Sequence, residues 1–208
     1  TMPGIDDSKR LTASHRALMS TRIRRTALDW AIGAATPREI DQLNIHNASL
    51  LAMRRAILGL RERVDYVYID GRFFPDIPIP GEPVIRGDQN IPVVSAASIL
   101  AKVSRDRMMR QYDIIFPEYG FAKHKGYGTK QHMEVITTRK ATPIHRQSFN
   151  PVGDHLPTFA YLKRNRLIDK LGEQLTACQF IRKGYEILET NYTIPKVGKI
   201  DIISLNES

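Results

Sequence analysis

Hydrophobic residues recur along the chain with helical spacing in long stretches and as short β-rich runs between them. Within residues 8–25, for example, Leu11, Leu18, Met19 and Ile23 fall near one face of a helix. Thr36 followed by Pro37 is typical of a helix start. The predicted helices are 8–25, one beginning at Thr36, 45–60, 95–115, 131–138 and 167–183, and the predicted strands are 27–35, 66–69, 84–85, 185–192 and 198–205.

This order of elements predicts an α/β fold in which helices pack on a mostly buried sheet. The composition changes near residues 153–166, where Gly153, Pro157 and the basic cluster 163–166 predict a linker. Residues 167–208 then contain one predicted helix and two predicted strands, which are too few to bury a core of their own. We therefore expect a first domain over residues 1–152 and an incomplete second domain over 167–208.

The charge balance indicates a polyanionic partner. The 208 residues include 31 Lys and Arg against 22 Asp and Glu, giving a net charge of +9. An excess of this size favours nucleic acid, although a ribosome-associated or merely basic protein is the alternative. The single cysteine, Cys178, excludes a disulfide framework and a thiolate zinc site and favours the cytoplasm. Neither a membrane span nor a signal peptide is predicted.

Two aspartates follow short predicted strands. Asp70 ends the run 68–71, and Asp88 ends the run 85–88. Asp70 followed by Gly71 would by itself indicate only a turn. Two carboxylates at neighbouring strand ends can instead converge on a hard divalent cation, which favours oxygen ligands. The pair therefore predicts a Mg²⁺ or Mn²⁺ site.

Two further segments carry cations suited to phosphates. In the predicted helix 95–115, small alanines allow close packing on a sheet, and Lys102 and Arg105 would point outward. A solvated helix face is the alternative. Residues 116–129 interleave aromatic side chains with Lys, His and Gly, which suits a nucleic-acid surface. A glycine-rich turn beside a packed aromatic hinge is the alternative there.

Taken together, these segments resemble bacterial ribonuclease HII, in the order and with the spacings of that family. The resemblance covers about residues 3–152 and is carried by residues 4–11, 68–71, 87–106, 116–127 and 145–149. It implies an RNase H-like mixed sheet flanked by helices. It also implies a monomeric endoribonuclease that cleaves RNA–DNA hybrid duplexes, and DNA containing ribonucleotides, 5′ to the ribonucleotide.

The resemblance also implies site residues and a cofactor. The family holds Mn²⁺ or Mg²⁺ with four carboxylates, of which Asp70 and Asp88 match two. Tyr127 matches the tyrosine that packs on the deoxyribose beside the ribonucleotide. The lysines in motifs associated with phosphate contacts are Lys9, Lys102 and Lys125.

Two features of that family have no match in this sequence. One is an Asp-Glu pair on the first strand, and the other is the Gly-Arg-Gly turn that reads the ribose 2′-OH. Asp6 and Asp7 do not replace the pair, because they match a later Asp-Ser-Lys segment. We therefore expect the first domain to be N-terminally truncated and cleavage by this chain to be impaired.

The tail resembles the start of the YraN family, small proteins for which a restriction-endonuclease-like α/β fold is implied. Residues 198–201 read Gly-Lys-Ile-Asp where that family has Gly-Glu-Ile-Asp, so Lys199 replaces a glutamate. Asp201 is then either a remnant metal ligand or a plain strand residue.

Three functions stay open from the sequence, beside a basic α/β protein without a nucleic-acid role. The first is an endoribonuclease that uses two-metal catalysis. The second is a catalytically dead fragment that binds RNA–DNA duplexes and cuts nothing. The third is a fusion of two nucleases, in which the tail adds a DNA-directed activity.

Overall fold

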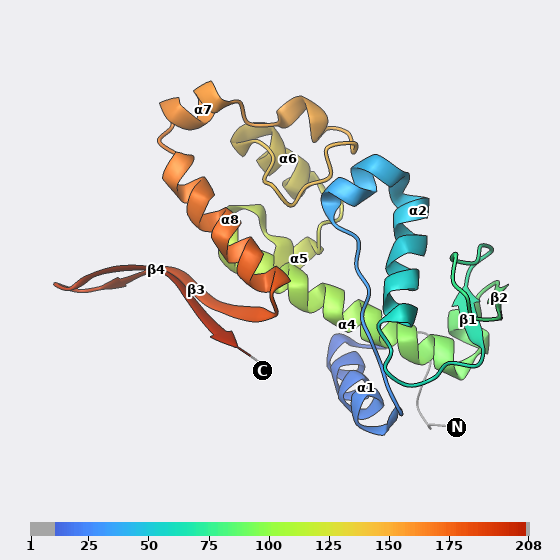
Figure 1. Cartoon of the computed structure of the whole chain (residues 1–208). Helices are drawn as coiled ribbons and strands as arrows, with labels where there is room; N and C mark the ends of the chain where they lie inside the picture. The colour runs from blue at the N-terminus through green and yellow to red at the C-terminus, as the bar shows by residue number, and fades with distance from the viewer. Residues whose placement is uncertain (1–10, 207–208) are drawn as a thin grey trace. The chain divides into compact units, whose positions relative to one another are not determined.

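The computed structural model describes residues 11–206, and the chain forms two compact units, Thr1–Arg105 and Asp106–Ser208. Figure 1 shows the order of helices and strands along the chain. The long helix α4 (Pro92–Ile115) contributes residues to both units.

The core of the first unit forms where α1 (Ala13–Thr26) packs on α4. Met19 and Ile23 are buried against Ile99 and Leu100. Thr12 caps α1, because its side chain accepts a hydrogen bond from His15 N. Of the residues predicted on this face, Met19 and Ile23 are buried and Leu11 packs against them, whereas Leu18 is 67% exposed.

Helix α2 (Pro37–Leu58) begins at a capping box formed by Thr36 and Glu39. The Glu39 carboxylate also pairs with Arg55 in the last turn of the helix. This pairing and the hydrogen bonds at Thr36 lower the pKa of Glu39 to about 2. Asn44 interrupts the helix with a positive φ of 68°, so the two predicted helical stretches are one element with a kink.

Residues 27–35 were predicted to form a strand, and that prediction is wrong. The segment has no regular secondary structure. Its polar and aromatic groups contact helices and loops: Asp29 accepts from Arg61 N at 2.6 Å, and Trp30 lies under the Arg24 guanidinium at 3.9 Å. A strand requires a neighbouring backbone to satisfy its N–H and C=O groups, and local composition does not supply one.

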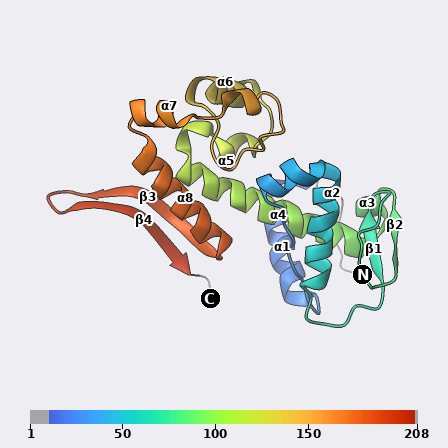
Figure 2. The same cartoon turned by 45° about the horizontal axis from the view of Figure 1, so that its top comes forward.

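The first unit also contains a parallel pair of short strands, β1 (Val67–Asp70) and β2 (Gly81–Val84). Val67 and Ile69 point to the buried side, and the alternate residues are exposed. The short helix α3 (Gly87–Asn90) follows β2 and contacts β1, as Figure 2 also shows.

The second unit is mainly helical. Besides the end of α4 it consists of η1 (Pro117–Tyr119), α5 (Phe121–His124), α6 (Lys130–Arg139), η2 (Gly153–His155), α7 (Phe159–Arg164), α8 (Ile168–Arg182) and the antiparallel strands β3 (Tyr185–Ile194) and β4 (Gly198–Asn206). The predicted linker 153–166 thus contains η2 and α7.

The tail shares its core with the preceding residues of the second unit. Ala177, Cys178 and Ile187 are buried in one cluster with Ile115 and Phe116. Polar contacts join the same elements: Ile187 N donates to Gln111 Oε1 at 2.6 Å and Gln174 donates to the Ile115 carbonyl at 3.1 Å. The helix and two strands, which cannot bury a core alone, therefore obtain one from α4 and η1.

The fold class is α/β, as predicted, with its strands in one parallel and one antiparallel pair. In both views α8 runs alongside the β3–β4 ribbon (Figures 1 and 2). None of the helices described is long and apolar enough to cross a membrane.

The packing of residues 27–36 on α2 depends on Gly33. A Cβ at this position would lie 2.5 Å from Ala56 N and closer still to the Ala52 carbonyl oxygen. We expect Gly33→Ala to lower the free energy of unfolding by about 1–3 kcal/mol, because the helix backbone must move. Urea denaturation followed by the fluorescence of Trp30, the single tryptophan, measures this.

The matched control is Gly172→Ala in α8, where a Cβ meets nothing within 4 Å. This change replaces a helix-interior glycine and should raise stability by up to about 1 kcal/mol, measured by circular dichroism. Equal effects of the two substitutions would contradict the close approach at Gly33.

Candidate metal and nucleic-acid site

Asp70 is the last residue of β1 and is exposed at the strand end. Its Oδ1 accepts a hydrogen bond from Gly87 N at 2.9 Å. A Cβ at residue 87 would lie 3.5 Å from Asp70 Cα and 3.3 Å from Val94 Cγ1. The backbone of α3 thus lies close against the end of β1 at Gly87, where the absence of a side chain allows this approach.

Asp88 comes directly after this contact and is buried, with 6% exposure. Its carbonyl oxygen accepts a hydrogen bond from Ser95 Oγ at 2.5 Å, which ties α3 to the start of α4. Arg86 makes the turn into α3 with a left-handed backbone, at φ 57°. The structure therefore brings the segments of Asp70 and Asp88 together, at the carboxyl ends of β1 and β2.

The donor chemistry of this edge fits a hard divalent cation. Such ions are commonly held by one or two carboxylates, with water and substrate phosphate completing the shell. Between Leu11 and Asn206, no group of three or more His, Cys, Asp or Glu side chains is arranged to hold an ion. Asp70 and Asp88 would thus supply two ligands of an incomplete shell.

The three lysines singled out from the sequence have different settings. Lys102 is half-buried on α4. Lys125 has a left-handed backbone, and its ammonium donates to the Ala122 carbonyl oxygen, so its charge lies at the end of α5. Lys9 lies outside the described residues.

Tyr127 lies in the turn between α5 and α6 and is 62% exposed. Both backbone polar groups of Tyr127 form hydrogen bonds. Tyr127 N donates to the His124 carbonyl at 2.9 Å, and the Tyr127 carbonyl accepts from Thr129 N at 2.8 Å and His132 Nδ1 at 3.0 Å. Tyr127 and Lys125 belong to the second compact unit, whereas the two aspartates and Lys102 belong to the first.

Three histidines beneath this turn form a cluster that the sequence analysis did not identify. His124 stacks on His132 with ring centroids 4.2 Å apart, and His132 Nε2 lies 3.0 Å from His145 Nε2. The Phe121 ring contacts all three imidazoles. His124 and His145 lie in segments that the sequence analysis had marked, but no sequence spacing shows that His132 joins them.

Burial keeps two of these histidines, His132 and His145, neutral. It lowers the pKa of His132, and it lowers the pKa of His145 to about 4, with the neighbouring His132 adding to the effect. Burial also raises the pKa of the Tyr119 phenol above its ordinary value. That phenol donates to the Lys140 carbonyl at 2.6 Å. At neutral pH the imidazoles of His132 and His145 therefore carry no charge.

In the tail, Asp201 is exposed and pairs with Lys199 at 3.0 Å. The same ammonium lies 3.2 Å from Glu173 Oε1 on α8. A lysine thus occupies the space between the two carboxylates, and hydrogen bonds to both raise its pKa. This arrangement favours an ion-paired strand residue at 201 over a metal ligand.

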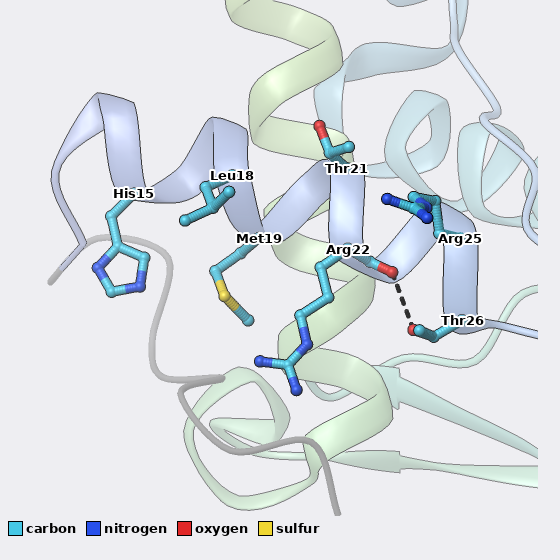
Figure 3. Close-up of a pocket in the computed structure, with 7 residues that line it drawn as sticks. All are labelled: His15, Leu18, Met19, Thr21, Arg22, Arg25 and Thr26. Atoms are coloured by element: carbon cyan, nitrogen blue, oxygen red, sulfur yellow. Dashed lines mark hydrogen bonds between the residues drawn. The ribbon is translucent and has the colours of Figure 1, made fainter.

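A shallow hollow lies along α1. Figure 3 shows its lining, which contains two arginines as well as apolar and hydroxyl side chains. The lining residues are His15, Leu18, Met19, Thr21, Arg22, Arg25 and Thr26. The first turn of α1 contains no acidic residue, and its last turn contains Arg24 and Arg25. The hollow is suited to an anionic surface such as a phosphate backbone.

Comparison with known proteins adds both sequence and structural evidence. The family model of ribonuclease HII matches residues 1–152. The ribonuclease H2 of Pyrococcus horikoshii OT3 has a similar structure, with a TM-score of 0.58 and 21% identity over 78% of this chain and 82% of that one. The ribonuclease HII of Archaeoglobus fulgidus, solved in complex with PCNA, has a TM-score of 0.50 and 19% identity over 76% and 83%.

The two structures are too distant in sequence to establish more than a shared RNase H-like fold. The family model, in contrast, spans most of the chain and includes Asp70, Asp88, Lys102, Lys125 and Tyr127. The protein accordingly belongs to the ribonuclease HII family.

Proposed function

We propose that this protein is a metal-dependent endoribonuclease that cleaves RNA–DNA hybrids, and ribonucleotide-containing duplex DNA, on the 5′ side of a ribonucleotide. The observation that carries the proposal is the contact between Asp70 and Gly87, which sets the Asp88 segment against the end of β1. Membership of the ribonuclease HII family supports a ribonuclease H-type activity.

In this proposal, Asp70 and Asp88 hold Mg²⁺ or Mn²⁺ through their carboxylate oxygens. The bound ions supply activation of the attacking water and stabilisation of the leaving 3′ oxygen. Asp70 already accepts one hydrogen bond through Oδ1, which restricts the orientation of its carboxylate.

The remaining residues bind and orient the duplex. The exposed ring of Tyr127 packs on the deoxyribose next to the ribonucleotide. Lys9, Lys102 and Lys125 contribute positive charge near phosphates, and the cationic lining of the α1 hollow adds to it. The cytoplasmic location and the monomeric state stay predictions from the sequence.

A binding protein without nuclease activity is the second candidate. It is favoured by the small number of carboxylates at the β1 edge, since the described residues contain no cluster of three metal-ligating side chains. Two-metal hydrolysis requires ions held on both sides of the scissile phosphate, and two aspartates form only part of such a shell.

Asp70→Asn separates metal chemistry from duplex binding. It keeps an oxygen to accept from Gly87 N but removes the negative charge that an ion requires. We expect metal-dependent cleavage of a duplex with one ribonucleotide to fall at least about a hundredfold, while the Kd for the same duplex changes less than about threefold. A 5′-labelled substrate resolved on a gel measures cleavage, and fluorescence anisotropy measures binding.

The matched control is Asp76→Asn, because Asp76 lies between β1 and β2 with a fully exposed side chain and only a long ion pair of 3.9 Å to Arg54. It should cleave like the unmodified protein. Undiminished turnover by Asp70→Asn would contradict the metal role. No cleavage by the unmodified protein, together with preferential binding of the ribonucleotide-containing duplex, would instead support the second candidate.

A further inference from the structure

The backbone of Tyr127 is held by a side chain as well as by its own turn. His132, from the first turn of α6, donates from Nδ1 to the Tyr127 carbonyl at 3.0 Å. The backbone N–H of His132 donates to Thr129 Oγ1 at 3.3 Å, so the residue is fixed at both ends. One buried imidazole in the first turn of α6 therefore supports an exposed turn.

The hydrogen-bond network assigns the proton positions on His145 and His132. Thr142 N–H donates to His145 Nδ1 at 3.0 Å, so the proton of His145 is on Nε2. That Nε2–H faces His132 Nε2 at 3.0 Å, which must accept, so the proton of His132 is on Nδ1. This is the proton that the Tyr127 carbonyl accepts.

His124 completes the same pattern. Its Nδ1 accepts from Gly126 N at 3.1 Å, so its Nε2 carries the proton and donates to the Tyr119 carbonyl at 2.7 Å. The Gly126 backbone has a positive φ of 79°, which suits a glycine in this turn. Residues on both sides of the turn are thus tied to neutral imidazoles.

We propose that His132 is a positioning residue that holds the Tyr127 backbone for contact with a nucleic-acid duplex, and that His145 imposes the tautomer on which this depends. The inference rests on the function proposed for Tyr127. His132 itself is buried at 3% exposure and acts through the turn, without touching the duplex.

The network works only with all three rings neutral. A second proton on His132 would meet the His145 N–H, one on His145 would meet the Thr142 N–H, and one on His124 would meet the Gly126 N–H. The surrounding charges oppose protonation as well. The titratable and charged groups that face the rings are the other imidazoles, the Tyr119 phenol from η1 and the Arg146 guanidinium.

Two substitutions at residue 132 separate positioning from packing. His132→Asn places an amide N–H where Nδ1 stood and keeps the donor to Tyr127. His132→Gln places its amide where Nε2 stood. The glutamine can therefore contact His145 but no longer donates a hydrogen bond to the Tyr127 carbonyl. We expect the Kd for a duplex with one ribonucleotide to rise about fivefold to tenfold in His132→Gln, and to stay within about twofold in His132→Asn.

His155→Gln is the matched control, since His155 is a half-buried histidine of the same unit that takes no part in the network. Its Kd should equal that of the unmodified protein. Equal weakening by His132→Asn and His132→Gln would overturn the proposal, because a residue that only fills space makes no distinction between the two amides.

A double-mutant cycle with Tyr127→Ala identifies the residue through which His132 acts. We expect Tyr127→Ala with His132→Gln to bind as weakly as Tyr127→Ala alone. Additive losses would overturn the inference and leave the function proposed for Tyr127 intact. If Tyr127→Ala alone leaves binding unchanged, the proposed function of Tyr127 fails, and NMR of the free protein then decides the inference.

The NMR measurement requires no nucleic acid. Imidazole ¹⁵N spectra at pH 7.5 should show His132 protonated on Nδ1 and His124 and His145 on Nε2. The Tyr127 amide resonance should shift in His132→Gln and stay in place in His132→Asn. A different tautomer of His132, or a Tyr127 resonance insensitive to residue 132, would overturn the positioning role.

Neutrality of the cluster also predicts a pH effect on stability. The pKa of His145 is about 4 in the fold, and histidine in an unfolded chain titrates near 6.5. The unfolded state therefore binds more protons between these values, and stability must fall as pH drops from about 6.5 toward about 4. His145→Gln keeps a donor toward His132 and should reduce the slope of unfolding free energy against pH by about one proton. An unchanged slope would contradict a buried neutral His145.

Discussion

Both cores of this protein depend on burying side chains of helix α4. Its first half contributes Ile99 and Leu100 to the cluster with α1, and its second half contributes Met109 and Ile115 to the cluster with the tail. Each such side chain contributes about 1.5–3 kcal/mol when fully buried. Ser95 in the first turns of the same helix bonds the Asp88 carbonyl. The helix that organises the cores therefore also fixes one end of the candidate metal site.

Two features of this protein suit a nucleic-acid duplex, its net positive charge and the exposed Tyr127 ring, and they differ in their electrostatics. A chain of net charge +9 attracts any polyanion, and phosphate contacts of this kind carry no information about the sugar. Discrimination of a ribonucleotide requires contacts that depend on shape. Tyr127 offers an exposed ring on a turn supported by neutral imidazoles. The histidines support that ring without adding further nonspecific positive charge.

Local patterns were sufficient for most helices. Helical spacing identified Met19 and Ile23 as buried residues of α1. Asp70 ends β1 and accepts a hydrogen bond from Gly87 N, whereas Asp88 lies in the short helix α3 and not at a strand end. Cation binding by the two aspartates stays a prediction. Residues 27–35 were assigned wrongly because a strand depends on a partner that composition does not reveal. Ile187 contacts Gln111, although the two residues are far apart in the sequence. His132 contacts His145, although no sequence motif links these two histidines. Such contacts follow from tertiary packing, which no local signal encodes.

The central claim is that Asp70 and Asp88 together bind a divalent cation, and paramagnetic Mn²⁺ tests it without relying on turnover. In an NMR titration of the whole chain, we expect substoichiometric Mn²⁺ to broaden the amide resonances of Asp70, Gly87 and Asp88 first, and Asp70→Asn to abolish this selective broadening. Broadening that begins elsewhere, or that persists unchanged in Asp70→Asn, would contradict the account.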